Sequence, residues 1–119
     1  MVDNSSEKWH PFENGETIGK PGPECGTIIW DEEYSDGARL TITGSGHIAP
    51  FSINIGVYDW IYYNLFFNTM PEARDAFQRI KPDIENILAL TTKEMPDAAK
   101  KQAVDAAIKD FIRRYPSSR

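Results

Sequence analysis

The chain has 119 residues, of which 40% are hydrophobic and 26% are charged, and this length suits one domain of ordinary size. The net charge is −5 and is unevenly placed, because residues 1–34 carry eight acids and two bases, giving −6. We therefore do not expect the protein to bind nucleic acid through its overall charge. The single cysteine, Cys25, excludes an intramolecular disulfide and a cysteine-based zinc site.

The sequence shows no targeting or membrane signal. Residues 1–7 are polar and acidic, where a signal peptide needs bases followed by an apolar run. No stretch approaches the roughly 20 apolar residues of a membrane helix. We therefore expect a cytoplasmic protein without a membrane partner.

Residues 1–26 are predicted to form an irregular N-terminal arm, and residues 27–116 a single α+β domain. The arm contains four glycines and three prolines and has no apolar periodicity. Its aromatic residues Trp9 and Phe12 indicate that it docks on something. Because the arm is acidic and the end of the chain is basic, we expect the arm to lie over the last helix, in the same chain or in a partner, with Trp9 or Phe12 as the apolar anchor.

A hairpin is predicted from residue 27 to residue 43, where apolar residues recur at every second position. A two-residue turn at Asp36-Gly37 would set apolar residues against acids. A three-residue turn, with Gly37 free to adopt a left-handed conformation, gives the better register. It pairs Tyr34 with Ala38, Glu32 with Leu40 and Trp30 with Ile42.

Two further strands are predicted after the Gly44-Ser45-Gly46 turn. Residues 51–57 alternate cleanly, and Phe51, Ile53 and Ile55 are expected beside Ile42, Leu40 and Ala38. Residues 60–67 have apolar residues at both odd and even positions, so periodicity alone also allows a helix. Their aromatic content favours a fourth strand, turned at Tyr58-Asp59.

Two helices complete the predicted chain. Thr69 and Glu72 have the spacing of a capping box, and Pro82 is expected to kink or restart the helix near Lys81. Met95-Pro96-Asp97 opens a second helix that Pro116 ends. The predicted fold is α+β, a four-stranded antiparallel meander followed by two C-terminal helices packed on it.

Four short segments of the chain are similar to small bacterial α+β proteins for which no activity is known to us. The similarity spans residues 25–90 approximately and implies a bacterial cytoplasmic domain, without a transferable activity. The segments are Trp30-Asp31-Glu32-Glu33, Gly37-Ala38-Arg39-Leu40-Thr41, Ala49-Pro50-Phe51-Ser52-Ile53 and Gly56-Val57-Tyr58-Asp59-Trp60.

A polar rim is the candidate ligand-binding site. The predicted register places Glu32, Tyr34, Tyr62 and Asn64 at the ends of neighbouring rows on the face under the helices, where they could anchor a small ligand. The simpler interpretation is that both outer strands meet solvent there. Glu32 lies on the apolar side, so its carboxylate must find a partner or have its pKa raised. The triplet Asp31-Glu32-Glu33 is interpreted as a solvated strand end beside Arg39.

An outward apolar surface is the candidate interface. If Trp60, Tyr62, Asn64 and Phe66 face the helices, then Ile61, Tyr63, Leu65 and Phe67 face the other side and need a cover. Either the second helix crosses to that face, or a second subunit covers it in a two-fold homodimer. The short connection from Thr91 to Met95 favours the homodimer, because it returns the second helix beside the first.

No catalytic, metal or cofactor site is predicted. The two histidines, His10 and His47, are far apart in the sequence, and spacing places no serine or cysteine nucleophile beside them. The leading interpretation is a non-catalytic, self-associating binding or interaction module, with an unidentified protein or small molecule as a further partner. The alternative is a small-molecule-binding or enzymatic domain that uses the polar rim.

Overall fold

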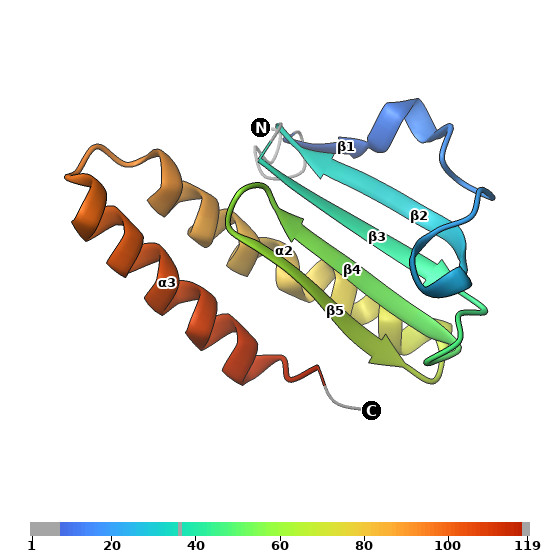
Figure 1. Ribbon diagram of the computed structural model, residues 1–119. Helices are drawn as coiled ribbons and strands as arrows, with labels where there is room; N and C mark the ends of the chain where they lie inside the picture. Colours follow the sequence, from blue (N-terminus) through green and yellow to red (C-terminus); the bar gives the residue numbers. More distant parts are fainter. Residues whose placement is uncertain (1–7, 36, 118–119) are drawn as a thin grey trace.

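The strands form one antiparallel meander in which each strand pairs with the next along the chain (Figure 1). The computed structural model describes residues 8–35 and 37–117. Two short 3-10 turns, η1 (Phe12–Gly15) and η2 (Pro23–Cys25), lie between the first two strands. The strands are β1 (Trp9–Pro11), β2 (Thr27–Tyr34), β3 (Ala38–Gly44), β4 (Phe51–Val57) and β5 (Ile61–Phe67). The predicted antiparallel sheet followed by two helices is confirmed, with five strands instead of four.

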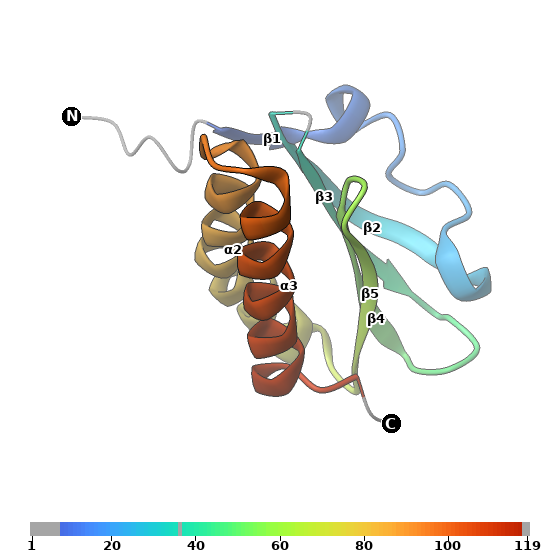
Figure 2. The same ribbon diagram turned by 60° about the vertical axis from the view of Figure 1, so that its left-hand side comes forward.

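The two helices lie side by side on one face of the sheet (Figures 1 and 2). They are α2 (Met70–Thr92) and α3 (Asp97–Arg114). The predicted capping box begins α2: Thr69 Oγ1 accepts from the backbone N–H of Glu72 at 3.3 Å, and Glu72 Oε1 accepts from the backbone N–H of Thr69 at 3.2 Å. The segment from η1 to η2 runs along the opposite, helix-free face, which we call the open face (Figure 2).

The hydrophobic core lies between the sheet and the helices. α2 contributes an apolar stripe at steps of three and four residues, as predicted. Its partners are the residues of the central strands that alternate toward the helices, and three residues of α3. The buried set includes Leu40, Ile42, Ile53, Ile55, Val57, Leu65, Phe77, Ile80, Ile84, Ile87, Val104, Ile108 and Phe111.

Pro82 does not interrupt α2, so the predicted restart near Lys81 is wrong. The proline is exposed, while Ile80 and Ile84 on either side of it in the sequence are buried. A proline on the solvent side costs one backbone hydrogen bond, and water can satisfy the carbonyl that is released. The apolar stripe of the helix therefore continues through this position.

The N-terminal arm contributes the additional strand. Trp9–Pro11 pairs with the end of β2, with Trp9 opposite Tyr34. Trp9 is only 7% exposed and donates its indole N–H to Glu85 of α2 at 2.8 Å. The ring centroid of Phe12 lies 3.8 Å from the guanidinium carbon of Arg39 on β3. The expected docking on the last helix is wrong for both anchors, because they contact α2 and β3.

The predicted pairing of β2 with β3 is confirmed. Trp30 lies opposite Ile42, Glu32 opposite Leu40 and Tyr34 opposite Ala38. Ser35, with φ of 39°, adopts the left-handed conformation that was expected at Gly37. Gly37 is needed for a different reason: a Cβ there would lie 2.9 Å from Cδ2 of Leu88, so the glycine allows α2 to approach the turn closely.

The pairing of β3 with β4 differs from the prediction by two residues. Leu40 lies opposite Ile55, and Ile42 opposite Ile53. A two-residue shift keeps every side chain on its predicted face, because the side-chain period of a strand is two. The predicted set of core residues on β3 and β4 is therefore unchanged by the difference in register.

The orientation of β5 is opposite to the prediction. Residues 61–67 form a strand, as favoured, but the loop has three residues, 58–60, so that Val57 pairs with Ile61. One extra loop residue turns every side chain of β5 to the other face. Leu65 is 4% exposed, and Ile61, Tyr63 and Phe67 pack on the core. The predicted outward surface of these four residues is therefore wrong.

Candidate functional site

The structure does not bring the four predicted rim residues together. Glu32 and Tyr34 lie on the helix-covered side of the sheet, with Leu40 and Ala38 as neighbours in the register. Tyr62 and Asn64 lie on the open face, because β5 is turned over. The predicted rim is therefore divided between two faces of the sheet.

Glu32 has the partner that its position requires. Its carboxylate accepts from Nζ of Lys81 on α2 at 2.8 Å and from the indole N–H of Trp30. Nζ of Lys81 also lies 4.9 Å from the ring centroid of Phe77. Both charged side chains are mostly buried, so this ion pair fixes α2 to β2.

A row of polar residues crosses the open face. Asp31 on β2, Thr41 on β3, Asn54 on β4 and Asn64 on β5 are consecutive register partners. Thr41 Oγ1 donates to Asp31 at 2.9 Å, and the side-chain amide of Asn54 donates to Oδ1 of Asn64 at 2.8 Å. Hydrogen bonds between neighbouring strands therefore hold these side chains in place on rigid elements.

Asp31 anchors this row. It is 1% exposed, which corrects the interpretation of residues 31–33 as a solvated strand end. Its carboxylate accepts from Nε and Nη2 of Arg39 at 2.9 and 2.6 Å, and from Thr17 Oγ1 at 2.8 Å. The hydrogen bonds to Asp31 raise the pKa of Arg39, whose guanidinium stays charged and oriented.

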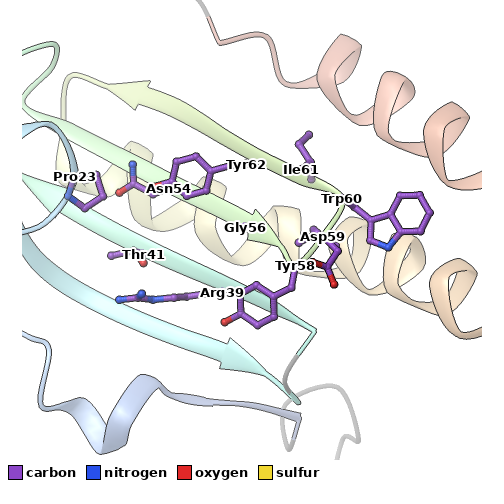
Figure 3. A pocket seen from close by; sticks show the side chains of 11 residues that line it. Pro23, Arg39, Thr41, Asn54, Gly56, Tyr58, Asp59, Trp60, Ile61 and Tyr62 are labelled. Atoms are coloured by element: carbon purple, nitrogen blue, oxygen red, sulfur yellow. The ribbon is translucent and has the colours of Figure 1, made fainter. Parts of the chain in front are cut away.

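A cleft of about 520 Å³ opens on this face beside the polar row (Figure 3). Thr41, Asn54 and Gly56 form its floor, and Arg39, Tyr58 and Tyr62 line its sides. In Figure 3 the ring of Tyr62 extends toward Asn54, whereas the indole of Trp60 points away from the floor. The cleft therefore combines fixed polar groups with aromatic surface, as small-molecule sites do.

Gly56 creates the depth of the cleft. It lies between Arg39 and Tyr62 in the register. A Cβ at Gly56 would meet only Cδ1 of Tyr62, at 3.8 Å, which is an ordinary contact distance. The space above Gly56 is therefore empty, and no other segment packs closely against this glycine. A larger side chain at this position would fill the cleft.

The rim of the cleft carries more acid than free base. Tyr58 donates its hydroxyl to Glu33 at 2.8 Å, and its partial burial together with this hydrogen bond raises its pKa. Asp59, at the tip of the loop, also lines the cleft. Because Asp31 compensates the charge of Arg39, the cleft offers hydrogen-bond donors without a net positive charge.

Two other hollows contain the remaining predicted residues. One of about 390 Å³ lies beside α2 and includes Glu32 and Trp30, and another of about 610 Å³ includes Tyr34. Glu32 is already paired with Lys81. The open-face cleft is the stronger candidate, because adjacent strands and a hydrogen-bonded network fix its floor.

Arg39, Thr41, Asn54 and Gly56 are the candidate residues that the sequence did not identify. Their common signal is alternation: Arg39 and Thr41 share a face of β3, and Asn54 and Gly56 share a face of β4. On strands whose other face is apolar, such polar and glycine positions mark the surface that a ligand can reach. The N-terminal arm, which helps to shape this surface, has no apolar periodicity that would predict its position.

Comparison with protein-family models, with curated proteins and with solved structures gave no match. Over residues 8–35 and 37–117, no group of three or more histidine, cysteine, aspartate or glutamate side chains could hold a metal ion. Within the same part of the chain, no helix is long and apolar enough to cross a membrane.

Proposed function

We propose that this protein is a non-catalytic binding module whose open-face cleft holds a small, planar, uncharged molecule. The observation that carries the proposal is the orientation of Arg39 by Asp31 at the side of the cleft. Nε and Nη2 of Arg39 are bonded to Asp31. Nη1 has no hydrogen-bond partner among the residues that the structure describes, so its two N–H groups are available to a ligand acceptor.

The size and surface of the cleft support a ligand of this kind. A volume of about 520 Å³ lies within the usual range for small-molecule sites. The ring of Tyr62, 68% exposed, offers a stacking surface at the side of the cleft. The ligand would place a flat ring near Tyr62 and a carbonyl or ring nitrogen toward Arg39.

The charges around the cleft favour an uncharged ligand over an anion. Asp31 compensates Arg39, and the carboxylates of Glu33 and Asp59 lie nearby. The buried carboxylates of Asp31 and Glu32 are each held in an ion pair. This pairing supports a structural role for both rather than acid–base catalysis.

Two matched probe molecules test the proposal. Benzamide and benzoate have the same ring, and only benzoate is charged. We expect ligand-observed NMR to detect weak binding of benzamide, with a Kd of roughly millimolar as expected for a fragment of this size. Benzoate should bind at least several-fold more weakly, because no uncompensated cation faces the cleft.

Two cleft variants and one control variant test whether the probe binds in the cleft. Gly56→Leu should abolish benzamide binding by filling the floor, and Ala106→Leu, at an exposed position of α3, should leave it unchanged. Tyr62→Ala provides a second test at an exposed side chain if Gly56→Leu does not fold. Binding of benzamide that survives both cleft variants, or preferential binding of benzoate, would refute the proposal.

A further inference from the structure

β5 is an edge strand of the sheet, with backbone groups directed away from β4. The backbone N–H of Tyr58 donates to Gly37 O at 3.0 Å, so even-numbered residues of β4 turn their backbone toward β3 and odd-numbered residues toward β5. Odd-numbered residues of β5 therefore bond to β4. The N–H and C=O groups of Tyr62, Asn64 and Phe66 point outward, as the hydrogen bond from Ser117 Oγ to Asn64 O shows.

The outward residues of β5 are self-complementary about a two-fold axis. Asn64 is the central residue of the seven-residue strand Ile61–Phe67. Antiparallel pairing centred there sets Asn64 opposite Asn64 of a second copy, and Tyr62 opposite Phe66. By symmetry, Phe66 also lies opposite Tyr62 of the second copy. All three pairs are hydrogen-bonded pairs, because Tyr62, Asn64 and Phe66 are the residues with outward backbone groups. Aromatic pairs across neighbouring strands add stability to such a pairing.

The two edges of the sheet differ in a way that selects β5. β1 has only three residues, and its last residue, Pro11, has no N–H to donate. Residues 8–34, which include β1 and β2, carry six acids and two bases, net −4, so that two copies meeting at β1 would repel. β5 carries no charged residue and no proline, and among the described residues the hydrogen bond from Ser117 Oγ to Asn64 O is the contact that covers its outward backbone. Meeting at β5 also places the acidic ends of the two copies farthest apart.

We infer that two copies of the chain associate through antiparallel β5–β5 pairing centred on Asn64, which forms one sheet of ten strands, five from each copy. Phe66 of the second copy then lies beside Tyr62, at the outer side of the open-face cleft. The N–H of Asn64 in the second copy replaces Ser117 Oγ at Asn64 O. This inference does not depend on the identity of the ligand.

Charge substitutions test both the association and its register. Sedimentation of the full chain over roughly 1 µM to 1 mM should show a monomer–dimer equilibrium, the behaviour of a small interface. Tyr62→Lys and Phe66→Glu, each alone, should weaken the dimer at least tenfold, because each sets a charge against an aromatic ring at the edge. The double variant should recover most of that loss, because the proposed register sets each new lysine opposite a new glutamate.

Two further variants sharpen the result. Ile18→Lys makes the same kind of change at a side chain of the N-terminal arm that is 42% exposed, and should leave the dimer unchanged. Ser117→Ala removes the competing donor and should strengthen the dimer by roughly two- to tenfold. A wild-type chain that stays monomeric up to about 1 mM, or a double variant no better than the single ones, would overturn the inference. Folding of every variant is checked by its thermal unfolding transition.

Discussion

The indole N–H of Trp9 donates to the carboxylate of Glu85 at 2.8 Å, across 76 positions of the sequence. The ring of Trp9 also packs edge-on against Tyr34, with 5.1 Å between the ring centroids. These contacts join a strand near the start of the chain to α2 and to the end of β2. The segment that looks least structured in the sequence therefore closes one end of the core.

Removal of the Trp9 side chain should destabilise the protein strongly. Trp9→Ala is expected to lower the free energy of unfolding by about 3–5 kcal/mol, because it empties a buried position. Trp9→Phe keeps an aromatic ring but loses the hydrogen bond to Glu85, so the smaller loss measures that bond together with the change in ring size, at roughly 1 kcal/mol or more. Urea unfolding measures both values. A loss below about 1 kcal/mol for Trp9→Ala would mean that β1 contributes little to the fold.

The Asp31–Arg39 pair should show strong coupling in a double-mutant cycle. Asp31→Ala is expected to cost about 3 kcal/mol or more, because it leaves the guanidinium without its bidentate partner. Arg39→Met leaves a fully buried carboxylate that still accepts from two threonines, Thr17 and Thr41. The double variant should cost clearly less than the sum of the single ones. Additive losses in urea unfolding would contradict a direct interaction.

The stability contributed by the Tyr58 hydroxyl should disappear in alkaline solution. Partial burial and the hydrogen bond to Glu33 raise the pKa of Tyr58 above its ordinary value of 10.0. Because the folded state holds this proton more tightly, the contribution is fully present below pH 10 and is lost as the pH rises through the folded-state pKa. The difference in unfolding free energy between the wild type and Tyr58→Phe should therefore be constant below pH 10 and shrink above it. A difference that grows above pH 10 would contradict the raised pKa.

The register of the first hairpin could be predicted because its two faces differ in composition. Setting Leu40 against Glu33 would place an apolar residue against an acid, so only one loop length was consistent with a buried face. β4 was recognised for the same reason. The pattern of β4 cannot distinguish registers that differ by two residues, because such a shift leaves every side chain on the same face.

The orientation of β5 and the open-face cleft could not be predicted in the same way. Residues 60–67 are apolar at both parities, so a loop of two and a loop of three residues both give a plausible buried face. The burial of Asp31 could not be predicted, because Thr17 of the N-terminal arm covers it, and the arm has no apolar periodicity. Tertiary contacts, rather than local pattern, decide both features.

The loop between β4 and β5 should tolerate changes that keep Val57 opposite Ile61. Asp59 has φ of 71°, the left-handed conformation that closes the three-residue loop. Asp59→Gly keeps the length and removes the steric cost of that conformation, so stability should be unchanged or higher by up to about 1 kcal/mol. Deletion of Asp59 leaves two loop residues between Val57 and Ile61, so the same pairing can form, and Ile61 and Leu65 stay on the core face. Both variants should therefore keep a cooperative thermal transition, measured by circular dichroism. A deletion variant without a cooperative transition would show that the three-residue loop, and not the buried face of β5, fixes the pairing of the strand.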